Sequence, residues 1–198
     1  MREIELKGVV PDVAALRRRL GDAGATLALA GRLEDRRYDT ADRSLTARDH
    51  VLRLRTCRPR EGPASTTVEW KGPTSLADGF KVRDELSAAT ADGDVLAQIL
   101  AQLGFRVIRE IDRDIEQYAL HGAVIRLETY PRMDTLLEVE GSPADIERAI
   151  VSTGISRAEF TGERLPEFVA RYEALSGERA AVSDRELRGD YRYSVGDG

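Results

Sequence analysis

Charged and apolar residues alternate, position by position, in segment after segment of this 198-residue chain. In Glu3-Ile-Glu-Leu-Lys7 the charged side chains occupy one set of alternate positions and the apolar side chains the other. A period of two residues is that of a β-strand, whose successive side chains point to opposite faces. The chain is therefore predicted to be rich in strands with one apolar face and one ionic face.

Eight segments are predicted to be strands. They are residues 2–9, 33–40, 51–58, 66–72, 80–88, 106–118, 124–130 and 135–140. Helical spacing of apolar residues lies between and after them, at residues 11–20, 92–104, 143–150 and 165–175. Ser142 fits the N-cap of the third of these helices and Pro143 its first position. Residues 73–79 are expected to form a loop because of their Pro and Gly content.

The ionic face is almost free of uncharged polar residues, which is unusual for strands that only face water. It consists of Glu3, Glu5, Lys7, Arg53, Arg55, Glu69, Lys71, Lys81, Arg83, Glu85, Arg109, Arg113, Arg126, Glu128, Glu138 and Glu140. Ordinary surface ion pairs could account for such a face, and each such pair contributes little stability. The helices, however, need an apolar surface to pack on, and only the faces opposite these charges offer one.

Eight strands are also the number that closes into a barrel with a modest interior. The fold predicted here is therefore α+β: a closed eight-stranded antiparallel β-barrel, or tunnel, with a charged lumen and helices packed on the outside. Buried charges need partners, and a polyanion together with divalent cations would neutralise both signs. Arginine and lysine suit phosphate oxygens, and clustered carboxylates suit Mg²⁺ or Mn²⁺.

Composition excludes several other classes. The net charge of −5 argues against a nucleic-acid-binding protein, despite the many arginines. The single cysteine, Cys57, excludes an intramolecular disulfide. No apolar run approaches the length of a membrane span, and the first residues lack the apolar core of a signal peptide. A cytoplasmic location with no membrane partner is expected.

The ordered set of motifs resembles the CYTH domains, also called triphosphate tunnel metalloenzymes. Glu3-Ile-Glu-Leu-Lys7 is similar to their Glu-x-Glu-x-Lys signature. The later matches, in the family's order, are Tyr38-Asp-Thr-Ala-Asp42, Leu52-Arg-Leu-Arg55, Glu69-Trp-Lys-Gly-Pro73, Lys81-Val-Arg-Asp-Glu85 and Glu138-Val-Glu140. The resemblance covers roughly residues 1–176, which we expect to form one domain. Residues 177–198 are expected to be a polar, loosely held tail in which Tyr191 and Tyr193 could dock.

The resemblance implies roles for the charged residues. Glu3, Glu5, Glu138 and Glu140 would hold Mg²⁺ or Mn²⁺, with Glu128 as a further metal candidate. Lys7, Arg53, Arg55, Lys71, Arg83 and Arg113 would bind the triphosphate, and strand parity adds Lys81, Arg109 and Arg126. Lys7, Lys71 and Glu140 are the expected catalytic residues. Two positions depart from the pattern: Arg37 stands where the family often has an aromatic residue, and Ile111 where a basic residue is common.

The implied function is that of a metal-dependent enzyme acting on ATP, tripolyphosphate or thiamine triphosphate. The family includes triphosphatases, in which water attacks phosphorus. It also includes class IV adenylate cyclases, in which the ribose 3′-hydroxyl of ATP attacks and releases pyrophosphate. A non-catalytic polyphosphate or nucleotide sensor is the alternative, but it would not need both acidic pairs, Glu3/Glu5 and Glu138/Glu140. The resemblance also suggests a homodimer.

Overall fold

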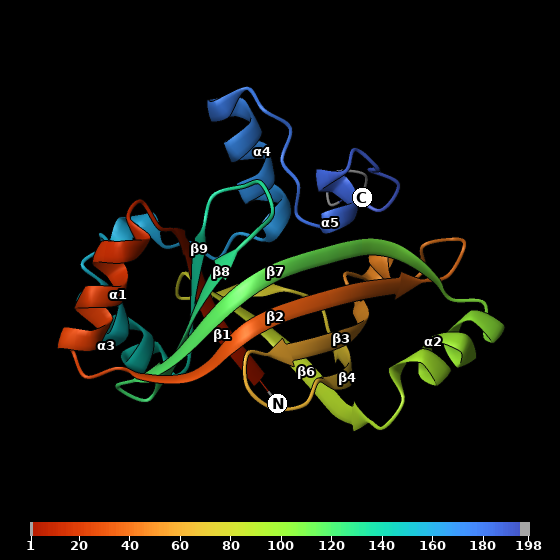
Figure 1. Cartoon of the computed structure of the whole chain (residues 1–198), viewed down its shortest axis with the longest axis horizontal. Helices are drawn as coiled ribbons and strands as arrows, with labels where there is room; N and C mark the ends of the chain where they lie inside the picture. The colour runs from red at the N-terminus through yellow and green to blue at the C-terminus, as the bar shows by residue number, and fades with distance from the viewer. Residues whose placement is uncertain (1, 195–198) are drawn as a thin grey trace.

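The alternating segments form one antiparallel sheet that closes on itself, in a computed structural model that describes residues 2–194 (Figure 1). The barrel strands are β1 (Arg2–Val9), β2 (Thr26–Asp39), β3 (Val51–Pro59), β4 (Ser65–Lys71), β6 (Phe80–Thr90), β7 (Arg106–Leu120), β8 (Ala123–Thr129) and β9 (Leu136–Glu140). Their order is β1-β9-β8-β7-β2-β3-β4-β6, and β6 pairs back with β1. The predicted closed eight-stranded barrel is confirmed.

Strand β1 closes the barrel because it pairs on both sides. Glu3 lies opposite Arg83 of β6, and Lys7 lies opposite Glu138 of β9. Since side chains alternate along each strand, this register turns the ionic faces of all the strands inward. Leu6 and Val139, the apolar neighbours in the same register, point outward and are fully buried.

Helices α1 (Val13–Asp22) and α3 (Pro143–Thr153) cover the outer face of β1, β8 and β9 (Figure 1). Their apolar residues, among them Leu20 and Ile146, join the largest buried cluster of the protein. The Ser142 hydroxyl accepts a hydrogen bond from the Asp145 N–H, 3.3 Å away, and Pro143 opens the helix. The predicted cap and first position of α3 are therefore confirmed.

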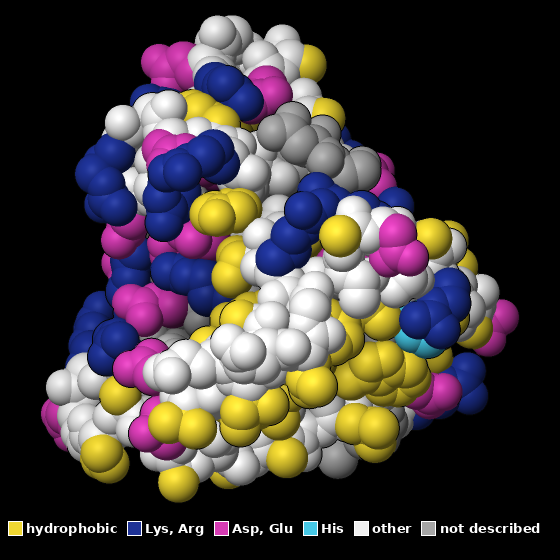
Figure 2. Space-filling view, turned by 90° about the vertical axis from the view of Figure 1, so that its right-hand side faces the viewer, with side chains coloured by type: hydrophobic (Ala, Val, Ile, Leu, Met, Phe, Trp, Pro, Cys, Tyr) yellow, Lys and Arg dark blue, Asp and Glu magenta, His cyan; other side chains and the backbone are white. Residues whose placement is uncertain are grey.

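Helix α2 (Gly93–Gln102) covers β2 and β3, where Leu100 packs with Tyr38 and Leu54. The opposite side of this helix leaves the apolar side chains of Val95 and Ile99 exposed to solvent. Figure 2, in which the side chains are coloured by type, shows apolar side chains gathered along the lower part of the molecule and charged ones around a hollow.

Helix α4 (Leu165–Ser176) and the residues after it pack over one end of the barrel (Figure 1). Phe168 of α4 and Val182 fit against Ile111 of β7, Leu136 of β9 and Tyr130, which directly follows β8. Ile111 thus belongs to the apolar lining of this end, which accounts for the absence of a basic residue there.

The expectation of a loosely held tail is wrong for the described residues after position 176. Ala181 and Val182 are buried, and the short helix α5 (Asp184–Leu187) follows them. The Asp112 N–H of β7 donates to the Val182 carbonyl oxygen at 2.8 Å. The aromatic rings of Tyr191 and Tyr193 lie under arginine side chains, as the sequence suggested for them. A domain boundary after residue 176 stays a prediction.

Two other elements differ from expectation. Strand β2 begins at Thr26 rather than Leu33, and the expected loop 73–79 contains the short strand β5 (Ser75–Ala77), which pairs with β6. Gly31 within the longer β2 allows β3 to approach closely, since a Cβ at this position would lie 2.3 Å from the Arg58 carbonyl oxygen. Short 3₁₀ turns complete the fold at Thr46–Arg48 and Arg157–Glu159. No helix within residues 2–194 is long and apolar enough to cross a membrane.

Candidate active site

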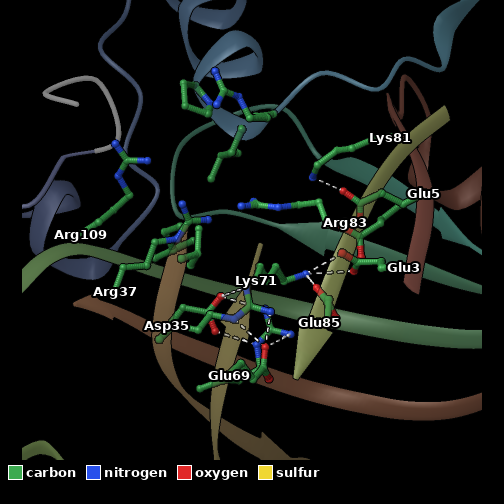
Figure 3. A pocket seen from close by; sticks show the side chains of 18 of the residues that line it. Glu3, Glu5, Asp35, Arg37, Glu69, Lys71, Lys81, Arg83, Glu85 and Arg109 are labelled. Carbon is green, nitrogen blue, oxygen red and sulfur yellow. Dashed lines mark hydrogen bonds and ion pairs between the residues drawn. The ribbon is translucent and has the colours of Figure 1, made fainter. Parts of the chain in front are cut away.

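All sixteen charged residues that the sequence placed on the ionic face line one cavity of about 560 Å³ inside the barrel. Figure 3 shows part of this lining. The structure therefore brings together every predicted substrate-binding, metal-binding and catalytic residue. The side chains come from seven of the eight barrel strands, and the register described above aligns them. Their roles in binding and catalysis stay predictions.

Strand β2 supplies two further lining residues, Asp35 and Arg37. The sequence had not pointed to Asp35, and Arg37 stood out only as a departure from the family pattern. Asp35 is buried and receives three guanidinium groups: Arg55 donates to it at 2.7 and 2.9 Å, Arg53 at 3.2 Å and Arg113 at 3.1 Å. Burial alone would raise the pKa of the Asp35 carboxyl, but these arginines outweigh burial and hold that pKa well below its ordinary value. Asp35 thus fixes three predicted phosphate-binding arginines in place.

Glu69 extends this ion-pair network along β4. Its carboxylate accepts a hydrogen bond from Arg53 at 2.7 Å and another from the Thr67 hydroxyl at 2.9 Å. Burial opposes ionisation, yet Arg53 and Arg55 lower the pKa of Glu69 to about 2. Glu69 is consequently ionised throughout the neutral range.

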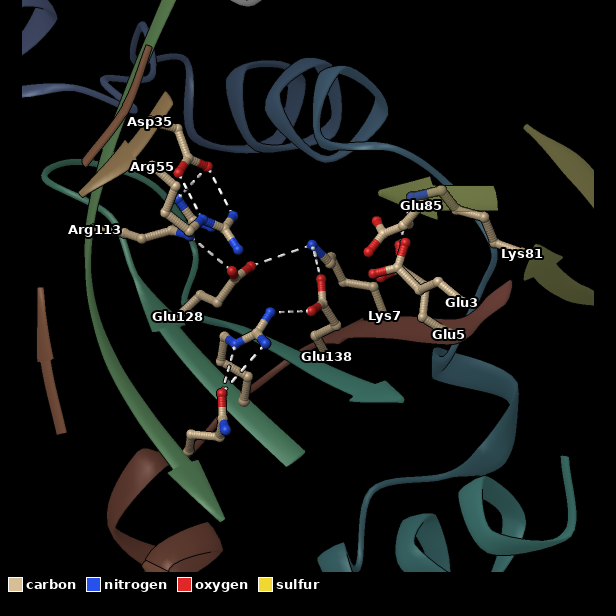
Figure 4. A network of polar contacts seen from close by, with 12 residues as sticks. Glu3, Glu5, Lys7, Asp35, Arg55, Lys81, Glu85, Arg113, Glu128 and Glu138 are labelled. Atoms are coloured by element: carbon tan, nitrogen blue, oxygen red, sulfur yellow. Dashed lines mark hydrogen bonds and ion pairs between the residues drawn. The ribbon is translucent and has the colours of Figure 1, made fainter. Parts of the chain in front are cut away.

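Lys7 stands between two carboxylates on the opposite wall (Figure 4). Its ammonium nitrogen lies 3.2 Å from Glu128 and 2.9 Å from Glu138. Burial would lower the pKa of Lys7, but Glu128 and Glu138 raise it well above its ordinary value. Arg113 and Tyr130 hold Glu128 from other directions, at 2.7 and 2.9 Å.

The other two lysines of the chain each hold a carboxylate of β1. Lys71 donates to both oxygens of Glu3, at 3.0 and 2.8 Å, and also contacts Glu85. Lys81 contacts Glu5. Burial, reinforced by Arg53, lowers the pKa of Lys71 to about 8 although Glu3 and Glu5 act against it. Lysine ammoniums are thus the present partners of Glu3 and Glu5, two of the predicted metal ligands.

Carboxylates crowd together where β1 meets β9. Glu5 lies directly opposite Glu140, and Glu138 is two positions further along the same strand. Burial, together with Glu3 and Glu138, raises the pKa of Glu140 to about 6. Burial and Glu138 also raise the pKa of Glu5, despite Lys81. Like charges directly opposite each other in a sheet are destabilising, so this wall favours a bound cation.

The donor chemistry of this wall fits a divalent metal ion. Its ligands are all carboxylate oxygens, which Mg²⁺ and Mn²⁺ prefer. Among residues 2–194 no three acidic, His or Cys side chains are yet close enough to form a ready-made metal site. Glu3 and Glu5 would have to turn away from Lys71 and Lys81 to hold the ion.

The remaining predicted residues lie on the same cavity. Arg126 contacts Glu138. The Arg126 guanidinium also donates two hydrogen bonds to the Gln117 side-chain oxygen, each at 3.3 Å. Arg83 donates to the carbonyl oxygens of Gly72, at 2.6 Å, and Asp49, at 2.7 Å. Arg109 projects from β7 beside Arg37 (Figure 3).

The mouth of the tunnel adds side chains that the strand pattern could not reveal. Arg43, Asp49, Arg164 and Glu167 line the cavity from the loop after β2 and from the start of α4. At the other end a second opening, of about 210 Å³, shares Arg55, Glu69 and Arg126 with the main cavity. The network around Asp35 thus forms a charged wall between the two openings.

Asp35 and Arg37 were not assigned to the ionic face because their strand is charged on both faces. Glu34 and Arg36 alternate with them and pair outside the barrel, with Arg58 at 3.1 Å and with Asp112 at 2.7 Å. The alternation of charged with apolar residues is therefore lost from 34 to 37. Strand parity could have identified them, because Leu33, Asp35 and Arg37 occupy alternate positions and therefore share one face of β2.

Three solved structures of similar architecture illustrate the fold. A Pyrococcus horikoshii protein, at 21% identity and a TM-score of 0.69, covers 89% of this chain and 99% of its own. A candidate adenylate cyclase from Vibrio parahaemolyticus has 18% identity and a TM-score of 0.72, with 85% and 97% covered. A candidate adenylyl cyclase from Hippeastrum with dominant triphosphatase activity has 14% identity and a TM-score of 0.58, with 89% and 96% covered.

At these identities the structures support the fold alone, and no curated protein sequence matches the chain significantly. The sequence itself matches the family model of the CYTH domain over residues 1–160. That range spans β1 to β9 and therefore contains every barrel strand and all sixteen predicted lumen charges. The chain belongs to the CYTH domain family.

Proposed function

We propose that this protein is a divalent-metal-dependent enzyme that acts on a phosphoanhydride bond of a triphosphate held in the tunnel. The observation that carries the proposal is the pairing of two walls in one cavity. One wall bears arginines fixed by Asp35, and the other bears the crowded carboxylates Glu3, Glu5, Glu138 and Glu140. A linear polyanion with bound cations complements both walls at once.

The residues of the chain would supply positioning and charge stabilisation, which dominate catalysis of phosphoryl transfer. Arg53, Arg55 and Arg113 are already oriented by Asp35 and Glu69, so little reorganisation is needed when phosphate oxygens approach. Lys71 and Lys81 would exchange Glu3 and Glu5 for phosphate oxygens. The carboxylates released in this way would hold the metal, which supplies Lewis-acid stabilisation of the phosphoryl charge.

The nucleophile distinguishes two reactions in the same tunnel. Water would give a triphosphatase. The 3′-hydroxyl of ATP, attacking the α-phosphorus with loss of pyrophosphate, would give cyclic AMP. The family match is compatible with either reaction. The Vibrio parahaemolyticus neighbour is named for adenylate cyclase activity and the Hippeastrum neighbour for triphosphatase activity. The homodimer that the resemblance suggests stays a prediction.

The deciding experiment offers the purified protein ATP, tripolyphosphate and thiamine triphosphate separately, each with Mg²⁺ and with Mn²⁺. Phosphate, pyrophosphate and cyclic AMP are measured in every reaction. Metal-dependent release of any of these products, abolished by EDTA, supports the proposal. Tight binding without any product would instead make the protein a sensor, and undiminished activity in EDTA would reject the metal scheme.

A further inference from the structure

Three arginines form a row across neighbouring strands near the tunnel mouth. Arg37 of β2 lies directly opposite Arg53 of β3 on one side and Arg109 of β7 on the other. Like charges directly opposite each other in a sheet destabilise it. Such a row needs either carboxylate partners from the protein or an anion from outside.

The protein supplies carboxylates to Arg53, but not to Arg37. Arg53 pairs with Asp35 and Glu69, as described above. Among residues 2–194 nothing makes a hydrogen bond or ion pair with the Arg37 side chain, and its buried Nε has no partner. Burial, followed by the charges of Arg109 and Arg53, lowers the pKa of Arg37 to about 9, although the charge of nearby Asp35 acts against this. The guanidinium is still charged at neutral pH, and its charge is poorly compensated.

A β-bulge lies beside Arg37. Arg37 pairs with Arg109 and the next residue, Tyr38, pairs with Val107, so β7 carries an extra residue, Ile108, at this point. As a result both Ile108 and Arg109 line the cavity. Bulges next to functional sites re-aim side chains, and this one brings two consecutive residues of β7 to the cavity beside Arg37.

The row faces the entrance rather than the floor of the tunnel. Arg37 and Arg109 lie side by side, across the cavity from Glu3 and Glu5 (Figure 3). Arg43 and Arg164 line the same mouth, whereas the floor is closed by the network around Asp35. The group of a bound substrate that points outward therefore meets Arg37.

We propose that Arg37, flanked by Arg109 and Arg53, forms an anion subsite for the outward-facing terminal phosphate of a linear inorganic phosphate chain. This inference rests on the proposed function, since it takes the tunnel to be a phosphate-chain site. A terminal phosphate carries charge and free oxygens that a guanidinium fork can hold. The ribose and base of a nucleoside triphosphate carry neutral hydroxyl and ring-nitrogen acceptors but no charge at this place, so the protein is expected to bind tripolyphosphate more tightly than ATP.

The test is a binding measurement, by calorimetry, of tripolyphosphate and of ATP in EDTA buffer, where metal-dependent turnover is stopped. Wild-type protein is expected to bind tripolyphosphate at least about tenfold more tightly than ATP. Arg37→Met should weaken tripolyphosphate binding by about tenfold to a hundredfold and ATP binding by less than about threefold. Arg37→Lys should recover part of the loss, because it keeps the charge but not the fork.

Arg36→Met is the matched control, because Arg36 is the next residue of β2 but points outward and pairs with Asp112. Arg36→Met removes the same charge and should leave the affinities for tripolyphosphate and for ATP within about threefold of the wild-type values. Thermal unfolding adds a second readout. Without ligand, Arg37→Met should melt at or above the wild-type temperature, since it removes like-charge repulsion, and its stabilisation by tripolyphosphate should be smaller.

Three outcomes overturn the subsite: wild-type affinity for tripolyphosphate in Arg37→Met, an equal loss for both ligands, or a lower melting temperature of the ligand-free variant. Failure of the proposed function is separate from these. If the wild type releases no product from any triphosphate, the enzyme proposal fails, while the binding measurements still decide the role of Arg37.

Discussion

At the scale of single residues, Asp35 is the point on which the arginines of the tunnel converge. Its two oxygens accept hydrogen bonds from Arg53, Arg55 and Arg113, and its side chain has almost no contact with solvent. Removing one member of a buried ion network leaves the other charges uncompensated, which costs more than the pair contributes. The arginines are poised for phosphate because one carboxylate holds them.

The variant Asp35→Asn should therefore lower the free energy of unfolding by about 3–5 kcal/mol, measured by urea denaturation at neutral pH. The matched control is Glu34→Gln, whose side chain points outward from the same strand and pairs with Arg58 and Arg32. Exposed pairs are worth little, so this control should lose less than about 1 kcal/mol. Equal losses for the two variants would contradict the central position of Asp35.

Glu140 is the residue whose replacement best separates catalysis from stability. No hydrogen bond or ion pair joins its side chain to another of residues 2–194, and it lies opposite Glu5. Glu140→Gln should lower metal-dependent turnover at least about a hundredfold, by analogy with the loss of other groups that stabilise transition-state charge. Its melting temperature should equal or exceed that of the wild type, because a like-charge contact is relieved.

Glu61→Gln, an exposed change of the same chemistry, serves as the control for turnover. Wild-type turnover in Glu140→Gln would remove Glu140 from the proposed metal wall. A variant that loses turnover together with its fold would point instead to a structural role.

At the scale of elements, the chain after α4 is part of the barrel's end rather than an appendage. Val182 is buried against Ile111 and Tyr130, and its carbonyl oxygen accepts the Asp112 N–H of β7. Strand β7 carries both Arg109 and Arg113, so this contact supports the strand from which they project. A packed segment outside the matched range of residues 1–160 thus stabilises the tunnel.

Val182→Asp should lower the free energy of unfolding by about 3 kcal/mol or more, because it buries an unpaired charge. Val151→Asp provides the comparison, since Val151 is 81% exposed and its replacement should cost about 0.5 kcal/mol or less. Chemical denaturation of both variants measures the difference. Similar small effects would mean that the segment is dispensable for the fold.

Strand periodicity predicted the barrel because the strands have one ionic and one apolar face. Closing the sheet places the ionic faces in the lumen and leaves the apolar faces outside, where the helices cover them. The pattern fails where its physical basis is absent. Strand β2 is charged on both faces around Asp35 because its outer charges pair with β3 and β7. Strand β5 has only three residues, too few to display a period.

The packed segment at 180–182 was missed for a different reason. Ala180, Ala181 and Val182 are small, and their burial depends on a hollow that Phe168 and Tyr130 create from elsewhere in the sequence. The charges at the mouth lie in loops and follow no period. Contacts between residues so far apart in the chain cannot be predicted from local sequence patterns.

At the scale of the whole molecule, the lumen is an ion network whose balance depends on pH. The pKa of Glu69 is about 2 in the folded protein, against an ordinary value of 4.5, and that of Asp35 is also lowered. A folded-state pKa below the unfolded one contributes stability that is present above the unfolded pKa. That stability is lost as the pH falls through the folded-state pKa.

Wild-type protein should therefore lose stability steeply between pH 4.5 and pH 2, as followed by thermal unfolding across that range. Glu69→Gln removes one titrating group, so its stability should depend less on pH there. The stability difference between the two proteins should be on the order of 2–3 kcal/mol at pH 6 and should shrink toward zero near pH 2. A constant difference across the range would mean that Glu69 contributes by packing and not by charge.

Closure through β1 has a consequence for how the protein is made. Strand β1 is synthesised before its two neighbours, which follow about 80 and about 135 residues later, in β6 and β9. Pairings so distant in sequence form slowly, because the long intervening loop must first be ordered. Until residues 136–140 are synthesised, β1 can pair with β6 alone, so the barrel cannot close around Glu5 and Lys7 before β9 is available.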